Sequence, residues 1–478
     1  MNSYNLLPIL VPLLSAGGSV LVLLGDLAAR RHPGVAQWIA AFILLLAGAF
    51  TIATWGQGGS GFFGQVWGDA FSSFFNLIFL AAALLVVLSG ADYLNRNGIH
   101  HGEYYSLLLL AVMGMSFMAS GGDLLIIFLG IEAMSIALYV LAGFHRNRPR
   151  SNEAALKYLL LGAFSTGFLL YGIAMVYGQI GTTNLIEFSN YLASSEAPLR
   201  GYMGIGVALL LVGLAFKAAA VPFHFWSPDV YDGAPTPVTA LMSTASKAAA
   251  FAVVLRVFYL PDYPLSLSWE NTLWGLAVLT MTVGNLSALA QTGIKRMLAY
   301  SSIAHAGYML VGVVAMNELG AAGILYYLGA YLFMNVGAFT IAWLVNHRGG
   351  GEYRISDYAQ LGYRSPTLAI LMSIVLLSLT GIPPLAGFFG KLYVFSAAVQ
   401  AEYVWLVVIA VLNNAVSVYY YLRVIVVMYM KEEEGLREVE RAPSVAFTAA
   451  VCAILIILLG VFSGSLLDLA RASVASLP

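Results

Sequence analysis

Residues 214–226 read L-A-F-K-A-A-A-V-P-F-H-F-W, and residues 378–391 read S-L-T-G-I-P-P-L-A-G-F-F-G-K. Each stretch interrupts a run of apolar residues, the first at Pro222 and the second at Pro383 and Pro384. Proline removes a backbone hydrogen bond and clashes with the preceding helical turn. In lipid, such a break is tolerated only where protein or a water-filled cavity satisfies the freed backbone groups. The two stretches therefore predict a pair of discontinuous helices inside a membrane protein.

The composition of the whole chain agrees with a membrane location. Of its 478 residues, 60% are hydrophobic and 9% are charged, and the mean hydropathy is +0.85, which is typical of a polytopic membrane protein. The net charge of −1 gives no general attraction to nucleic acid. Cys452 is the one cysteine, which excludes an intrachain disulfide and a multi-cysteine metal or cluster site. Any redox centre that this protein serves must then lie on another chain.

The apolar runs predict an all-α polytopic fold. A spanning helix needs about 20 mainly apolar residues. The chain has fourteen candidates, centred near residues 15, 45, 80, 111, 133, 165, 214, 247, 280, 306, 332, 382, 416 and 456. These runs are continuously apolar rather than alternating, so strand spans are not expected.

The basic residues between these spans predict an orientation. One side collects fourteen of them: Arg30, Arg31, Arg96, Arg146, Arg148, Arg150, Lys295, Arg296, Arg348, Arg354, Arg364, Lys431, Arg437 and Arg441. The other side has three: Arg200, Arg256 and Arg471. By the positive-inside rule, the first side faces the cytoplasm and both termini lie on the outer side.

The two broken spans are the seventh and the twelfth, so they run in opposite directions through the membrane. Paired interrupted helices in inverted halves indicate a transporter-type site near the midplane. The alternative is two unrelated packing kinks. The sequence similarity between the halves is faint, so the inverted repeat rests on the breaks and the topology.

Four charged residues lie inside predicted spans: Glu132, Lys217, Lys247 and Lys391. A charge at membrane depth costs roughly 2.5–3.5 kcal/mol on insertion scales. Several such costs in series suggest a path for protons or cations. For Lys391, which is nearer one end of its span, snorkelling to the interface is an alternative, and for Glu132 a neutral, hydrogen-bonded structural role is another.

Two histidines are candidate relay elements. His305 is central in the tenth span and is flanked by Ser301, Ser302 and Tyr308, although a buried neutral histidine in the core is the usual alternative. His224 follows Pro222 and would connect the lysines to the inner side, or would simply be an interfacial histidine. The Y-Y-Y run at 419–421 suits interfaces and packing rather than a cofactor site.

Glu132 and Lys217 together suggest a switch. If Glu132 moved away from Lys217, a proton-holding lysine would become a proton-releasing one, because two unit charges about 4 Å apart interact by about 4 kcal/mol at an effective dielectric near 20. No strand-linked G-x-G-x-x-G, P-loop or H-E-x-x-H motif is present.

The sequence around these charges resembles one known family. Residues 216–240, F-K-A-A-A-V-P-F-H-F-W-S-P-D-V-Y-D-G-A-P-T-P-V-T-A, are similar to the seventh-helix signature of the antiporter-like, proton-translocating subunits of respiratory complex I. I-K-R-M-L-A-Y-S-S-I-A-H-A-G-Y at 294–308, the stretch at 378–391 and N-E-A-A-L-K-Y-L-L-L-G-A at 152–163 resemble the subunit N type of bacterial NADH–quinone oxidoreductase. The resemblance covers about residues 100–430.

This resemblance implies one transmembrane domain over 1–478, with about fourteen transmembrane helices and discontinuous helices seven and twelve. Its parts would be three N-terminal helices at 1–100, two inverted five-helix repeats at 101–260 (spans four to eight) and 268–430 (spans nine to thirteen), and a C-terminal helix at 443–478. The family's functional positions fall on five residues of this chain: Glu132, Lys217, Lys247, Lys391 and His305.

The function implied is proton translocation coupled to quinone reduction in partner subunits of an NADH:quinone oxidoreductase, in a bacterial inner membrane. The resemblance places FMN, iron–sulfur clusters and quinone on those partners, and no cofactor or metal on this chain. Neighbouring antiporter-like subunits are the expected partners, with lipid and protons and without nucleic acid. The alternatives are an antiporter subunit of a multi-subunit Na⁺/H⁺ exchanger, a stand-alone solute transporter and a structural scaffold.

Overall fold

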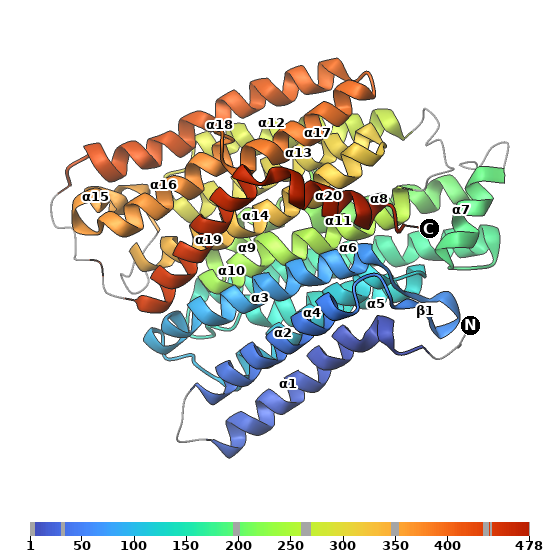
Figure 1. The fold of residues 1–478 in the computed structure, drawn as a ribbon, viewed down its shortest axis with the longest axis horizontal. Helices are drawn as coiled ribbons and strands as arrows, with labels where there is room; N and C mark the ends of the chain where they lie inside the picture. The colour runs from blue at the N-terminus through green and yellow to red at the C-terminus, as the bar shows by residue number, and fades with distance from the viewer. Residues whose placement is uncertain are drawn as a thin grey trace.

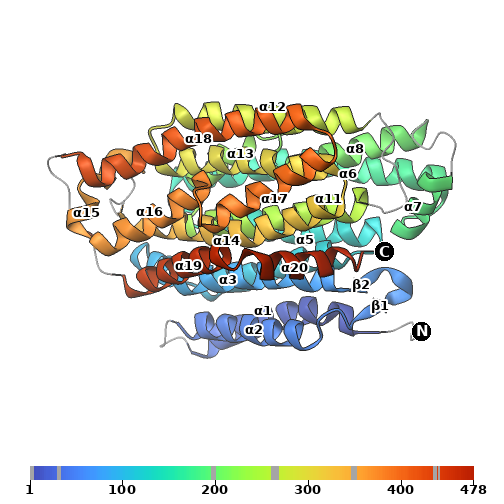
Figure 2. The same cartoon turned by 45° about the horizontal axis from the view of Figure 1, so that its top comes forward.

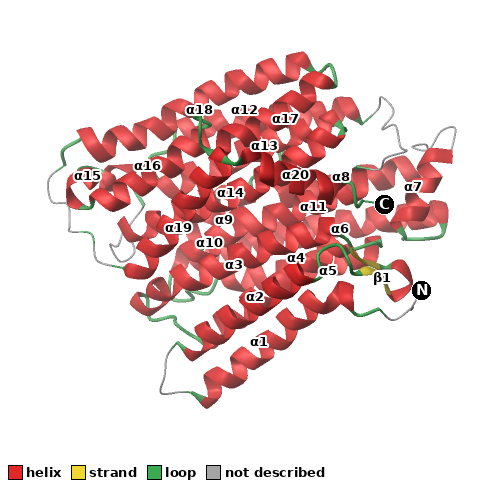
Figure 3. Cartoon of the chain, in the orientation of Figure 1, coloured by secondary structure: helices red, strands yellow, loops and turns green. Residues whose placement is uncertain are grey.

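The computed structural model describes residues 5–29, 34–194, 201–259, 269–345, 353–433, 439 and 442–477. It is an elongated bundle whose main helices run roughly parallel to one another (Figure 1). Almost all of the ribbon is helical (Figure 3). Six arginines of the charge count lie outside the described residues: Arg30, Arg31, Arg200, Arg348, Arg437 and Arg441.

The helices of the first half are α1 (Leu10–Ala28), α2 (Val35–Ala53), α3 (Ala70–Arg96), α4 (Gly102–Ser120), α5 (Leu124–Ala142), α6 (Pro149–Ile180), α7 (Leu185–Ser194), α8 (Tyr202–Ala218), α9 (Trp226–Gly233), α10 (Thr236–Leu241) and α11 (Lys247–Phe258). Those of the second half are α12 (Glu270–Leu289), α13 (Ile294–Ala315), α14 (Glu318–Val345), α15 (Leu361–Arg364), α16 (Pro366–Thr380), α17 (Ala386–Gln400), α18 (Val404–Met430), α19 (Pro443–Val461) and α20 (Ser463–Val474). Short 3-10 turns lie at Leu7–Ile9, Phe62–Gly64 and Ile355–Tyr358, and a π-helical turn lies at Met242–Ser246.

Twelve helices in the described part of the chain are long and apolar enough to cross a membrane. The predicted helical membrane fold is therefore confirmed. At the seventh and twelfth predicted spans the structure instead has the shorter apolar helices α8 and α16, each followed by a break. The count of fourteen stays a prediction, because it depends on joining each of these to the helix beyond its break.

A small β-hairpin is an exception to the helical fold. Strand β1 (Gly59–Gly61) pairs antiparallel with β2 (Val66–Gly68) between α2 and α3. The strands are three residues long and glycine-rich, so the sequence has no alternation of apolar and polar residues that would predict them. Both chain ends approach this region, because the Asn5 side chain contacts Gly58 and the Phe71 N–H donates to Ser476 Oγ at 3.0 Å. The N- and C-termini accordingly lie at one end of the bundle (Figure 1).

The centre of the bundle is formed by α10 with α11, by α13 and by α14. In their most apolar segments, 100%, 94% and 89% of the residues of these helices are buried, against 39% for α1 and for α2. Figure 2 shows α1 and α2 along one edge and α12 and α18 along the opposite edge. A helix that is apolar on all faces is buried by its neighbours. Lys247 and His305 therefore lie on the best-buried helices.

Both predicted breaks are present, and they end their first half-helix in the same way. In α8 the Ala220 N–H bonds the Ala215 carbonyl and the Ala219 N–H bonds Phe216; in α16 Ile382 bonds Leu377 and Gly381 bonds Ser378. This is the Schellman pattern, with Ala219 (φ 58°) and Gly381 (φ 90°) in the left-handed conformation. A glycine makes that conformation easy at residue 381, while Ala219 adopts it with a side chain.

Candidate functional site

All three predicted lysines are buried at 4% exposure or less. Lys217 lies in the last turn of α8, Lys247 begins α11, and Lys391 lies in α17 beyond the second break. Each ammonium group donates to oxygen atoms of a different helix, as the following paragraphs describe. Snorkelling is therefore not the arrangement of Lys391, whose Nζ points back into the protein.

Lys217 reaches α5 through a serine. Its Nζ donates to Ser135 Oγ at 2.7 Å, and the Ser135 hydroxyl donates to the Ile131 carbonyl. Ser135 lies one turn after Glu132, so both project from the same face of α5. Glu132 is half-buried, and among the described residues its Oε1 has no hydrogen-bond partner and makes no ion pair with Lys217. Lys217 thus contacts the serine one turn after Glu132 and not the carboxylate itself.

Lys247 links two central helices. It follows the π-helical turn Met242–Ser246, and its Nζ donates to the Ser302 hydroxyl at 2.6 Å and to the Ser302 carbonyl on α13. A π turn inside a helix is often found at a functional site, because it leaves backbone groups unpaired by the regular ladder. The helix that carries Lys247 also packs against α8, which carries Lys217.

His305 joins three helices through two tyrosines. Its Nδ1 lies 2.6 Å from the Tyr327 hydroxyl on α14, and its Nε2 lies 3.0 Å from the Tyr421 hydroxyl on α18. The Tyr421 hydroxyl also hydrogen-bonds Ser301, the neighbour of the serine that holds Lys247. Since a neutral imidazole donates at one nitrogen and accepts at the other, this arrangement can take a proton on one side and give one on the other.

The side chain of Lys391 lies across the second break. Its Nζ donates to the carbonyls of Leu379 and Thr380 at 2.8 and 3.0 Å and to the Asn414 side chain on α18. These carbonyls end α16, where the helix dipole favours a cation. A cavity of about 560 Å³ between α17 and α18 is lined by Lys391 and Asn414. On its other side, Lys391 lies 5.2 Å from the ring of Tyr308.

His224 lies within the first break and is buried, with 6% exposure. Its Nδ1 has no hydrogen-bond partner among the described residues. Its ring lies against Phe225, with 4.5 Å between the centroids, and no bond joins it to Lys217. The relay role and the interfacial alternative both stay predictions.

The polar residues that hold the lysines and the histidine were not predicted: Ser135, Tyr327, Asn414 and Tyr421. Ser302 was noted only as a neighbour of His305, and the tyrosine run at 419–421 was assigned to packing. A signal was available in that run, because a phenol in the middle of an apolar span needs a hydrogen-bond partner.

Comparison with known proteins adds the family. Residues 121–417 match the family described as "NADH:quinone oxidoreductase/Mrp antiporter, TM". The chain is 50% identical over 422 residues to a protein of Trichlorobacter lovleyi named "NADH-quinone oxidoreductase subunit N", covering 88% of this chain and 87% of that one.

Two solved structures share the fold. A chain of respiratory complex I from Thermus thermophilus superposes with a TM-score of 0.83 at 36% identity, over 97% of this chain and 100% of that one. A chain of an Mrp complex from Dietzia sp. reaches a TM-score of 0.85 at 22% identity, over 100% and 98% of the two chains, which shows the fold alone.

Proposed function

This chain belongs to the subunit N family of NADH-quinone oxidoreductases, and from that premise we propose that it translocates protons through Glu132, the three buried lysines and His305. It acts as a membrane subunit of a proton-translocating oxidoreductase and does no redox chemistry itself. The observation that carries this proposal is the series of buried ammonium groups, each hydrogen-bonded to another helix. Such groups at membrane depth are costly unless they have a function.

The proposed route has two sections. In the first, a proton held by Lys217 is exchanged through Ser135, near Glu132, and passes to Lys247 on the neighbouring α11. In the second section, the proton passes from Lys247 by way of Ser302 to His305 with its two tyrosine partners, and from there to Lys391. Hydroxyl groups suit both steps, because each accepts one proton while donating another.

The switch that we propose uses the gap between Glu132 and Lys217. With Ser135 as the immediate partner of Lys217, the carboxylate has no direct ion pair to break when it moves. Bringing the two charges to about 4 Å would stabilise the protonated lysine by about 4 kcal/mol at an effective dielectric near 20, and separating them would favour proton release.

The His305 relay gives a specific prediction. Replacing Tyr421 by phenylalanine removes the hydroxyl at Nε2 of His305 and keeps the ring. We expect proton pumping by the assembled enzyme to fall by about 10²-fold, the low end of the loss typical of one proton-transfer group. Pumping is measured in inverted vesicles with a pH-sensitive dye. Tyr419→Phe is the control, because Tyr419 lies two residues away in the same run and is 63% exposed. Equal pumping by both variants would exclude Tyr421 from the route.

The cofactors and the setting complete the proposal. Cys452, the one cysteine of the chain, cannot supply the set of thiolates that an iron–sulfur cluster needs. We propose that the clusters, and with them FMN and the quinone, belong to partner subunits. The partners include other membrane subunits of the same complex. The chain lies in a bacterial inner membrane with both termini on the outer side, which the fourteen-to-three distribution of basic residues supports.

The experiment that tests the function is affinity purification of the tagged chain from native membranes in mild detergent. We expect it to arrive in a large assembly that oxidises NADH with a quinone acceptor. Arrival with a few small hydrophobic chains, without NADH oxidation and with Na⁺/H⁺ exchange in reconstituted vesicles, would replace this function by that of an antiporter subunit.

A further inference from the structure

Asn285 is a buried asparagine on α12 that the proton route described above does not use. Its side chain is 0% exposed, and both of its polar atoms are hydrogen-bonded. Nδ2 donates to the Met281 carbonyl at 2.8 Å and to the Tyr308 hydroxyl at 2.9 Å, and Oδ1 accepts from the Tyr420 hydroxyl at 3.0 Å. A side-chain amide buried among apolar residues is costly unless it is hydrogen-bonded. These bonds therefore fix the amide and, through it, the hydroxyl of Tyr308.

Close packing of α12 against α13 supports the bond between Asn285 and Tyr308. In the chain, Gly284 directly precedes Asn285, and Gly307 directly precedes Tyr308 on the facing helix. A β-carbon at Gly284 would lie 2.6 Å from the backbone nitrogen of Ala304, and one at Gly307 would lie 2.5 Å from the α12 backbone. Because only residues without a side chain allow such an approach, the two glycines let the backbones come together. The two bonded residues are thereby held at fixed positions relative to each other.

The ring of Tyr308 lies beside two members of the proposed proton route. Nζ of Lys391 lies over the ring, 5.2 Å from its centroid. The imidazole of His305 meets the ring edge to face, with 5.8 Å between the centroids. Among the described residues, no hydrogen bond joins His305 to Lys391 directly. Tyr308 therefore lies at the last step of the route, between the histidine and the lysine.

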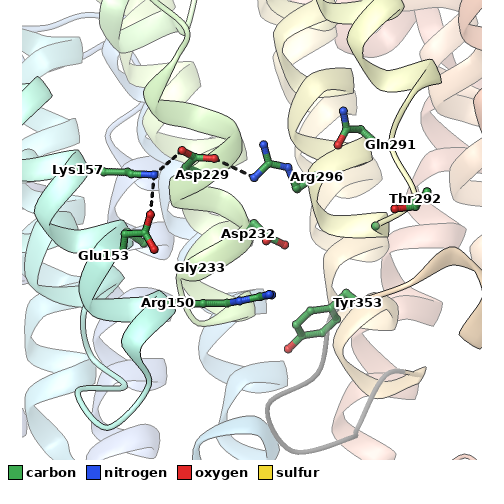
Figure 4. Close-up of a pocket in the computed structure, with 12 residues that line it drawn as sticks. Arg150, Glu153, Lys157, Asp229, Asp232, Gly233, Gln291, Thr292, Arg296 and Tyr353 are labelled. Carbon is green, nitrogen blue, oxygen red and sulfur yellow. Dashed lines mark hydrogen bonds and ion pairs between the residues drawn. The ribbon is translucent and has the colours of Figure 1, made fainter.

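The charge of Lys391 depends on neutral groups, because it pairs with no carboxylate in the described part of the chain. Its Nζ donates to two backbone carbonyls and to the Asn414 side chain. Lys157 on α6 is a contrast, since its Nζ lies 2.7 Å from both Glu153 and Asp229 (Figure 4). Those carboxylates favour the charged form of Lys157. At Lys391 an aromatic ring contributes instead, because a cation within about 6 Å of a ring face is attracted to it.

We propose that Asn285 is a positioning residue for proton transfer to Lys391. By holding the Tyr308 hydroxyl, Asn285 keeps the ring over the ammonium group, where the ring stabilises the protonated lysine. This inference rests on the proposed proton route and adds to it a residue that bonds neither His305 nor Lys391. The alternative is that Asn285 only joins α12 to its neighbours.

Two single variants and their double variant test this role, by proton pumping in inverted vesicles and by assembly on native gels. Asn285→Leu removes the amide and fills a similar volume, and Tyr308→Phe removes the hydroxyl and keeps the ring. We expect each to lower pumping roughly three- to tenfold, the effect of weakening a contact between a cation and an aromatic ring. The double variant should pump no worse than the single ones, because both remove the same bond.

Asn285→Asp is the conservative variant, and it distinguishes a bond to Tyr308 from simple packing. Burial disfavours a charged carboxyl group, and the neutral acid can donate to Tyr308 and accept from Tyr420, as the amide does. We expect this variant to keep most of the native pumping. If Asn285 served only to fill space between apolar helices, leucine would be the better replacement.

Asn413→Leu is the matched control. Asn413 also joins α18 to α12, by donating to the Thr282 hydroxyl at 3.2 Å, and its side chain does not bond Tyr308. This variant should pump at close to the native rate. If Asn285→Leu does not assemble, Tyr308→Phe tests the same bond from its other end.

Lys391→Ala separates the failure of this inference from the failure of the proposed function. Native pumping by Lys391→Ala would overturn the route and this inference with it. If Lys391→Ala pumps poorly, the route is supported, and the positioning role is then judged by the other variants. That role is overturned by native pumping in Tyr308→Phe, by equal losses in Asn285→Asp and Asn285→Leu, or by an equal loss in Asn413→Leu.

Discussion

Lys217→Ala is expected to lower proton pumping by the assembled enzyme to less than about a tenth of the native rate, the effect of removing an essential proton-transfer group. The variant loses the ammonium group that donates to Ser135 at 2.7 Å and leaves a methyl group that cannot hold a proton. Burying the ammonium group of Lys217 costs free energy, so its removal should leave assembly of the complex largely intact. Pumping is measured with a pH-sensitive dye in inverted vesicles, and assembly by native gels.

The variant Lys217→Arg tests whether pumping needs only the positive charge of residue 217 or also its ability to release a proton. Arginine keeps a positive charge beside Glu132 but does not release its proton at physiological pH. If the role of Lys217 is to give up a proton, the arginine variant should pump as poorly as the alanine variant. Native pumping by Lys217→Arg would mean that only the charge is needed, and native pumping by both would remove Lys217 from the route. Lys431→Ala, at an exposed position beyond α18, is the control.

Glu132→Ala gives the companion result. Its carboxylate makes no ion pair with Lys217 in this structure, so its removal should leave the Ser135 contact in place. Pumping is nevertheless expected to fall, because the switch needs a negative charge that can approach the lysine.

The breaks and the buried charges could be predicted from the sequence because they are local. A proline beyond the first turn of a helix interrupts it, and breaks at Pro222 and Pro383 are present between α8 and α9 and between α16 and α17. The depth of Lys217, Lys247 and Lys391 also follows from counting residues along a span, and all three are buried.

The partners of these charges could not be predicted, because they come from distant segments. Ser135 and Lys217 are 82 residues apart, and Tyr421 and His305 are 116 apart. Which hydroxyl meets which cation depends on how helices rotate and cross, and an apolar span offers no strong periodicity to fix its rotation. The bond between Ser135 and Lys217 is one such contact, and the approach of Glu132 to Lys217 stays a prediction. Glu132 and Ser135 lie one turn apart on the same face of α5, and Ser135 is the one that bonds Lys217.

The contacts of Arg256 could also not be predicted from the sequence. Its substitution is expected to have the largest effect on stability. Arg256 was assigned to the outer side as a loop-like charge, but its side chain is fully buried at the end of α11. It binds both oxygens of Asp69, at 2.6 and 2.8 Å, and donates to the Ala119 carbonyl at 2.8 Å. Its guanidinium also lies over the ring of Phe71, 4.7 Å from the centroid. It therefore ties α11 to the start of α3 and the end of α4.

Arg256→Met is expected to lower the free energy of unfolding by about 3–5 kcal/mol, the cost of leaving one partner of a buried ion pair uncompensated. The unpaired group would be Asp69, whose side chain is 14% exposed and which also caps α3 by accepting from the Ser72 N–H at 2.7 Å. The free energy is measured by titrating the purified full chain in mixed micelles with sodium dodecyl sulfate.

The double variant Asp69→Asn with Arg256→Met distinguishes the buried charge from the lost packing. Asparagine still caps α3 and carries no charge, so most of the stability should return if the unpaired carboxylate is the cause. Arg471→Met, at an exposed position on α20, should change stability by no more than about 0.5 kcal/mol. If the double variant is as unstable as Arg256→Met, the contacts of the guanidinium with Ala119 and Phe71 hold these helices together, and the ion pair with Asp69 does not.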